Sequence, residues 1–269
     1  MAIASEAWLD LLGMAWHDEE SSHVLLVPLA VIWLCWVRRK RFAECVPGGR
    51  LVGTGILGAG WLFWSIGYRF QIESFWHGGA VLMAAGGLLS VLGQDVFVKF
   101  LPAFAVLVFL VPVPGTGRVA LAVPLQRLTA TITQHIAETL GMVVERQGNL
   151  LNVNGKDIAV IEACNGMRMV FTLLFACYVF AFITPLRGYV RVLILAASPL
   201  VAIACNVFRL VPTIWMFGHA SAESANAFHE FAGWAMLLVA FGALLGVVKL
   251  LEWAMVPVAP SPQTGMRAN

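Results

Sequence analysis

The fold of this chain is decided by RVLILAASPLVAIACNVFRLVPTIW, residues 191–215. The stretch is almost continuously apolar from Val192 to Cys205, and it exceeds the roughly 20 residues that an α-helix needs to cross the hydrocarbon core of a bilayer. Arg209 interrupts it near one end, and an arginine in a span usually faces a partner or a water-filled cavity because its charge is costly in lipid. The stretch therefore predicts a membrane helix with a functional group at one end.

The composition of the whole chain is that of a membrane protein. Of its 269 residues, 60% are hydrophobic and only 12% are charged, and the mean hydropathy is +0.83, far from the balance of a soluble domain. A net charge of +2 without a large basic block argues against a nucleic-acid partner, because few phosphates could be neutralised. We therefore expect an all-α integral membrane protein in the lipid bilayer.

Apolar windows of membrane length predict about seven transmembrane helices. The expected spans are 24–37, 51–68, 77–93, 96–114, 165–184, 191–215 and 231–250. The amino terminus carries acidic residues and lacks the basic region of a cleavable signal peptide, so it is expected to be retained. Glycine-rich stretches at 53–60 and 78–87 indicate close helix packing, since no strand precedes them as in a phosphate-binding loop.

The chain is interpreted as one polytopic domain, residues 1–269. Its parts are an extracytoplasmic amphipathic segment (1–23), an extracytoplasmic or re-entrant helix followed by a β-hairpin (116–163), and a set of catalytic helices (164–252). The helix expected at 116–141 has apolar residues at helical spacing but is too polar to face lipid. Gly-Asn at 148–149 and Asn-Gly at 154–155 are hairpin turn signals between short runs with β-branched residues.

Basic residues beside the spans predict the orientation of the chain. The run RRKR at 38–41 follows the first span and should be cytoplasmic, which places the amino terminus outside. Alternation then brings the start of the fifth span, the end of the sixth and the start of the seventh to the outer face. Cys164, Arg209 and His229 lie at these three points.

Cys164 lies in IAVIEACNGMRMVFTLL, where polar side chains interrupt an apolar run. A thiolate is favoured at a helix amino terminus or beside a cation, because both lower the pKa of a thiol. Asn165 suits the start of a helix, and Arg168 would share the helix face of Cys164. Glu162 either points to that same face or braces Arg168. This pattern favours a reactive cysteine over one that only packs.

His229 and Arg209 can complete a site around such a cysteine. A histidine can accept the thiol proton and later donate one to a leaving amine. Arg209 stays protonated, so its role would be to bind a carbonyl or an oxyanion. Asn206 shares its helix face and can hydrogen-bond the same site. Arg209 could instead pair with a carboxylate such as Glu162 or Glu230.

Two other classes of function compete with an enzyme. A transporter or channel would line a polar path with Arg168, Arg209, Glu162 and His229, and a non-enzymatic scaffold of polysaccharide export would give Cys164 no role. No metal or other cofactor is expected, since the other cysteines lack ligand or disulfide spacing and most are expected to pack as small apolar residues. The cysteines other than Cys164 are Cys35, Cys45, Cys177 and Cys205. The histidines interpreted as interfacial polar residues are His17, His77, His135 and His219.

Three blocks carry a family resemblance: EACNGMR at 162–168, NVFRL at 206–210 and FHEFAGW at 228–234. They resemble the signature blocks of the exosortase/archaeosortase family of multi-pass membrane cysteine transpeptidases. The resemblance covers most of the chain in order, and it includes SSHVLLVPL at 21–29 and ERQGNLLNV at 145–153.

The resemblance implies a nucleophile, Cys164, with Arg209 and His229 as the essential arginine and histidine. The supporting or substrate-binding residues would be Asn165, Arg168, Asn206, Glu162 and His23. Family members are thought to cleave the carboxy-terminal sorting tail of exported proteins, which is a PEP-CTERM-like motif followed by one membrane helix and a basic cluster. The acyl group then passes to an acceptor nucleophile, whose identity stays unknown. The implied location is the bacterial inner membrane, often in bacteria that make exopolysaccharide, with the active site facing the periplasm.

The chain departs from the usual family pattern at three places. Asn165 stands where the family has serine after the cysteine, and Val24 stands where it has glycine after the early histidine. The usual extra hydrophobic span before that histidine is missing or reduced to residues 1–15. These departures leave the subfamily and the sorting motif open.

Overall fold

The computed structural model describes residues 5–253 except 18, 47, 49, 149, 154–155 and 160–165. Cys164, Asn165 and Glu162 therefore lie outside the described residues. The contacts gather in two units, Met1–Arg118 and Val119–Asn269.

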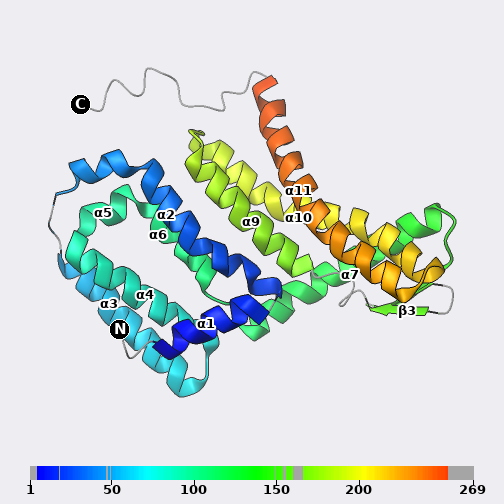
Figure 1. The fold of residues 1–269 in the computed structure, drawn as a ribbon, viewed down its shortest axis with the longest axis horizontal. Coiled ribbons are helices and arrows are strands. Elements are labelled where there is room, and N and C mark those ends of the chain that lie inside the picture. The colour runs from blue at the N-terminus through cyan, green and yellow to red at the C-terminus, as the bar shows by residue number, and fades with distance from the viewer. Residues whose placement is uncertain are drawn as a thin grey trace. The chain divides into compact units, whose positions relative to one another are not determined.

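The amino-terminal unit is helical throughout its described elements (Figure 1). They are α1 (Ser5–His17), the 3₁₀ segment η2 (Glu19–Leu26), α2 (Val27–Val37), η3 (Arg39–Glu44), α3 (Arg50–Phe70), α4 (Glu73–Leu92), α5 (Gln94–Lys99), α6 (Leu101–Ala105) and η4 (Val106–Leu110). The next helix, α7 (Gly115–Thr139), begins at the junction of the two units and confirms the helix predicted at 116–141.

The carboxy-terminal unit combines long helices with a small sheet. Its elements after α7 are β1 (Val144–Gln147), β2 (Leu150–Val153), β3 (Lys156–Ala159), α9 (Gly166–Ile183), α10 (Gly188–His219) and α11 (Ala222–Trp253). Both α10 and α11 have 32 residues, more than the roughly 20 needed for a single crossing.

The structure supports a multi-pass membrane protein but does not confirm seven spans. Among the described residues, four helices are long and apolar enough to cross a membrane, or up to six if each of two bent helix pairs is one span. The predicted span 24–37 contains only the 11 residues of α2 after a 3₁₀ segment. The predicted span 96–114 is divided into α5, α6 and η4, with Pro102 in the first turn of α6, where proline suits a new helix start.

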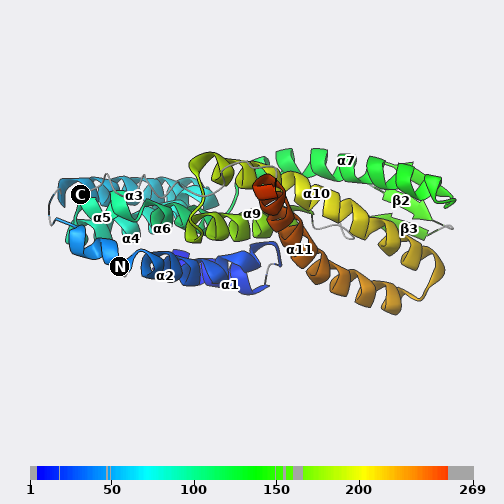
Figure 2. The same ribbon diagram turned by 90° about the horizontal axis from the view of Figure 1, so that it is seen from above.

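Glycines let the backbones of α3 and α4 touch. A Cβ at Gly67 would lie 2.1 Å from the backbone nitrogen of Trp76, and one at Gly79 would lie 2.2 Å from that of Trp64. Figures 1 and 2 show the two helices side by side. The close packing predicted from the glycine-rich stretches is thus confirmed, because no larger side chain fits at these contacts.

We expect Gly67→Ala to lower the thermal unfolding midpoint of the detergent-solubilised protein. The added methyl group must separate two backbones, and overpacking of this kind typically costs about 1–3 kcal/mol. Gly58→Ala is the matched control, because Gly58 lies on the same helix as Gly67 and a Cβ there meets nothing within 4 Å. The control should hold or raise the midpoint, because alanine favours a helix over glycine by about 1 kcal/mol. Equal midpoints for the two variants would contradict the contact.

A buried histidine attaches α1 to α4. The ring of His77 is fully buried, and its Nε2 lies 3.0 Å from Oδ2 of Asp10 on α1. Its Nδ1 lies 2.8 Å from the carbonyl oxygen of Glu73. His77, which the sequence predicts to be an interfacial polar residue, is covered by protein, because α1 packs on this face of α4 through the small residues Ala7 and Ala80.

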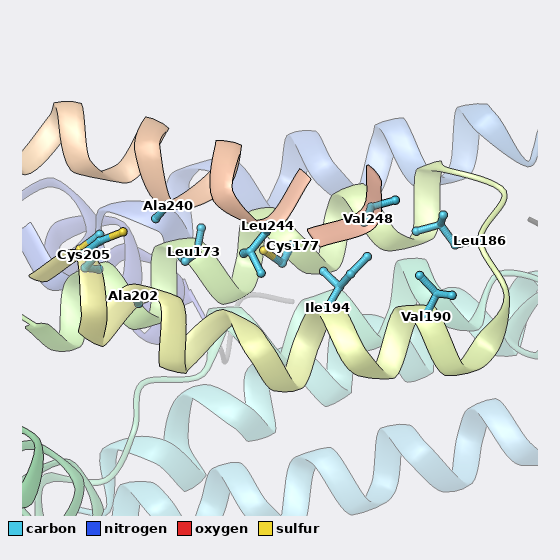
Figure 3. Close-up of a cluster of buried hydrophobic side chains, with 11 residues drawn as sticks. Leu173, Cys177, Leu186, Val190, Ile194, Ala202, Cys205, Ala240, Leu244 and Val248 are labelled. Atoms are coloured by element: carbon cyan, nitrogen blue, oxygen red, sulfur yellow. The ribbon is translucent and has the colours of Figure 1, made fainter. Parts of the chain in front are cut away.

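The helices α9, α10 and α11 share one apolar core (Figure 3). Cys177 of α9 and Cys205 of α10 are buried in it, which confirms the packing role expected of them. At one end of the cluster, Figure 3 places Leu173 of α9 beside Ala202 of α10 and Ala240 of α11. These three residues therefore mark the same level along the three helices.

A three-stranded antiparallel sheet packs on α7 and on the carboxy-terminal half of α10. Its order is β1-β2-β3, and Val144 pairs with Val153 in β2. Gly148, with φ of 64°, follows β1, as the turn signals predict, so the expected hairpin is confirmed and extended by β3. Figure 2 shows the strands between α7 and α10. The buried residues of this contact are Ala130, Ala137, Val144, Leu151, Val153, Leu210 and Ile214.

Candidate functional site

The helix α10 is shaped by two prolines, each beside a hydroxyl residue. Pro199 has no N–H to donate to the carbonyl of Leu195, and the hydroxyl of Ser198 donates to that oxygen at 2.9 Å instead. Pro212 likewise has no N–H for the carbonyl of Phe208, and in the same turn Thr213 Oγ1 donates to the carbonyl oxygen of Arg209 at 2.8 Å. At Pro199, therefore, a side-chain donor replaces the missing backbone donor.

Arg209 is almost fully buried, with 8% of its surface exposed. Its Nη2 donates to Oδ1 of Asn206 at 3.2 Å. The two residues are three positions apart and therefore share one helix face. On the neighbouring face, Leu210 and Ile214 pack against the sheet. The guanidinium is therefore held by a buried amide on a segment of α10 that the sheet supports.

The helix α11 approaches Arg209 at a glycine. A Cβ at Gly233 would lie 2.9 Å from Nη1 of Arg209. His229 lies one turn before Gly233 and so on the same face of α11; it is half-buried, and its Nδ1 is shielded from solvent. The close approach of the two helices thus brings the face that carries His229 toward the guanidinium.

The amino-terminal turn of α9 lies at the same level as this contact. Leu173, Ala202 and Ala240 mark one level of the core in Figure 3. Gly166 of α9, Arg209 of α10 and Gly233 of α11 each lie about two turns further in the same direction along their helices. The first residue of α9 and the guanidinium-bearing residue are therefore level with each other.

The other predicted site residues have different positions in the structure. Arg168 lies in the first turn of α9, and its side chain is outside the described part of the chain. His23 belongs to the amino-terminal unit, where it is buried and its ring forms a T-shaped pair with that of Phe109, at 6.4 Å between centroids. Within the described residues, no three histidine, cysteine or acidic side chains gather to hold a metal ion.

Gly233 was not predicted from the sequence. Its signal is a glycine in the interior of a long helix, one turn after a candidate histidine. Such a glycine costs the helix about 1 kcal/mol relative to alanine, which indicates a packing or functional reason. The contact that supplies the reason depends on how α10 and α11 cross.

A comparison with protein families shows the family of the chain. The model of the transmembrane exosortase family matches residues 15–246. The chain belongs to the transmembrane exosortase family. No curated protein sequence and no solved structure matches it. The family match includes α9, α10 and most of α11, and hence the segments that carry Cys164, Arg209 and His229.

The helical segments that lead to Arg209 and His229 are long enough to cross a membrane. Arg209 lies about 30 Å along α10 from Gly188, and His229 lies about 30 Å along α11 from Lys249, at 1.5 Å per residue. This distance equals the usual thickness of the hydrocarbon core. Each of the two helical segments is therefore about as long as the hydrocarbon core is thick.

Proposed function

We propose that the chain is a membrane-embedded cysteine transpeptidase that cleaves the carboxy-terminal sorting tail of exported proteins. The observation that carries the proposal is the burial of Arg209 between Asn206 and α11, level with the amino terminus of α9. A buried cation at the level of a helix amino terminus supports a site for a thiolate and for the oxyanion that its attack produces.

Cys164 is the proposed nucleophile. Only Asn165 separates it from Gly166, the first residue of α9. A thiol at the amino terminus of a helix is favoured as the thiolate, which is the reactive form, because the positive end of the helix dipole lowers its pKa. The place of Cys164 in the sequence, two residues before the start of α9, supports this role.

The first half of the proposed reaction is acylation of the enzyme. The Cys164 thiolate forms a bond to the carbonyl carbon of the scissile peptide, and the carbonyl oxygen becomes an oxyanion. Arg209 donates hydrogen bonds to this oxygen, a contribution that is usually worth about 10²–10³ in rate per donor. The carbonyl re-forms, the C–N bond breaks, and protonated His229 donates its proton to the leaving amine.

The second half releases the product. An acceptor amine, hydroxyl or water attacks the thioester carbonyl, and His229 takes the proton of the acceptor. The tetrahedral intermediate expels the thiolate, which returns the enzyme to its starting state. With water as acceptor, the same residues act as a peptidase. The chemistry needs no metal or other cofactor.

The family suggests the substrate and the location. The proposed substrates carry a PEP-CTERM-like motif, one membrane helix and a basic cluster, and the site is proposed to face the periplasm from the bacterial inner membrane. The helix lengths support this assignment: with Gly188 and Lys249 at one membrane surface, Arg209 and His229 would reach the other, where a peptide bond just before a membrane helix would lie. A link to exopolysaccharide production is part of this proposal.

Co-expression with a candidate tailed protein tests the proposal. We expect the substrate to lose the mass of its tail in cells with the wild-type enzyme and to keep it in cells with empty vector. Purified enzyme with added hydroxylamine should yield a product ending in a hydroxamate, since hydroxylamine intercepts a thioester. Full-length substrate in both strains would contradict tail cleavage, and cleavage without hydroxamate would contradict the thioester.

A further inference from the structure

Gly233 differs from the other glycines of its helix. Its ideal Cβ position lies 2.9 Å from Nη1 of Arg209, whereas a Cβ at Gly242 or Gly246 meets nothing within 4 Å. The atom that it would meet is at the tip of a side chain and not in a backbone. Alanine at 233 would therefore displace the guanidinium without forcing α10 and α11 apart.

We propose that Gly233 is a positioning residue for the reaction, which sets where the guanidinium of Arg209 points. One side of the guanidinium is fixed by the hydrogen bond from Nη2 to Asn206, and the other lies against the bare backbone of α11 at Gly233. A planar guanidinium that is bonded through one nitrogen and packed against a backbone at another has a limited range of orientations. The inference rests on the proposed function, in which that orientation directs Nη donors at the developing oxyanion.

A small displacement of the Arg209 guanidinium is sufficient to lower the rate of the proposed reaction. Ordinary van der Waals contact begins near 3.4 Å, so a methyl group at 233 moves Nη1 by a few tenths of an ångström at least, or turns the group away from Asn206. Hydrogen bonds to a transition state weaken steeply with such errors, and a misplacement of about 1 Å can cost 10²-fold in rate. Gly233 thus acts through Arg209 and does not itself need to touch the substrate.

The first test compares Gly233→Ala with Gly242→Ala in a tail-cleavage assay on the solubilised enzyme. We expect Gly233→Ala to lower kcat about 10- to 100-fold with KM nearly unchanged, because the lost interaction belongs to the transition state. Gly242→Ala adds the same methyl group to the same helix where there is no neighbour, and it should keep the wild-type kcat.

The second test does not depend on activity. In a double-mutant cycle, Gly233→Ala is introduced into the wild type and into Arg209→Ala, and the thermal unfolding midpoint is measured. We expect Gly233→Ala to lower the midpoint when Arg209 is present and to leave or raise it when the guanidinium is absent. This cycle also covers the case in which Gly233→Ala folds poorly, since Arg209→Ala should then restore its folding.

Two results would overturn the inference. One is a wild-type kcat for Gly233→Ala, and the other is an equal effect of Gly233→Ala on the midpoint in both backgrounds. Failure of the proposed function is distinguished by Cys164→Ser: if that variant still cleaves the tail, the thiol mechanism is wrong. An inactive Cys164→Ser with a fully active Gly233→Ala would refute the positioning role alone.

Discussion

Replacing Cys164 by serine is expected to abolish removal of the sorting tail while leaving the amount of enzyme in the membrane unchanged. A serine hydroxyl is a much weaker nucleophile at neutral pH, and neither a helix dipole nor an arginine lowers its pKa into a useful range. Loss of a nucleophile typically costs more than about 10³-fold in rate. The measurement is the mass of a co-expressed tailed protein.

The matched control for this experiment is Cys205→Ala. Cys205 lies on α10 and is buried in the apolar core of α9, α10 and α11. Its replacement removes a thiol without removing the proposed nucleophile. Cys205→Ala should process the tail at a rate close to that of the wild type. Wild-type processing by Cys164→Ser would show that the reaction uses another group, and solute uptake that survived this change but depended on Arg209 would favour a transporter.

Arg209→Lys is expected to reduce kcat about 100-fold or more, although the positive charge is kept. A guanidinium can hold Asn206 with one nitrogen and present others to an oxyanion, whereas an ammonium is a point charge on a flexible stem. Removal of one oxyanion donor usually costs about 10²–10³ in kcat. Single-turnover cleavage of a tailed substrate would place the loss in the acylation step.

Arg191→Lys is the control for Arg209→Lys. Arg191 lies on the same helix, α10, near its opposite end, where its guanidinium stacks over the ring of Phe182 at 5.1 Å from the centroid. Lysine can keep much of a cation–π contact, so this variant should cleave normally. Equal activity of the two lysine variants would mean that the charge at 209 suffices and that no oriented guanidinium is needed.

The sequence predicted those features of the fold that depend on local pattern. Hydrophobic length located the helices α3, α4, α10 and α11, and the turn dipeptides located the sheet. The number of spans was not confirmed, because hydropathy averages over breaks such as the one before Pro102. The buried position of His77 could not be predicted either, since it depends on α1 folding back over α4.

In the candidate site, too, features that follow from spacing along one helix were predicted, and contacts between helices were not. Asn206 and Arg209 share a helix face by their spacing alone, and they hydrogen-bond in the structure. The contact of Gly233 with Arg209 depends on the crossing of α10 with α11, which no local pattern encodes. Cys164 stays a prediction from sequence and family, supported by the level of Gly166 in the core.

The backbone contact between α3 and α4 has a consequence for biosynthesis. Only Gln71 and Ile72 connect the two helices, and Gln71 has φ of 56°, so the chain reverses direction within a single tight turn. Two apolar helices that are joined by so short a turn and contact each other at glycines can pair before they enter the lipid. We infer that the pair leaves the insertion machinery as a preassembled helical hairpin.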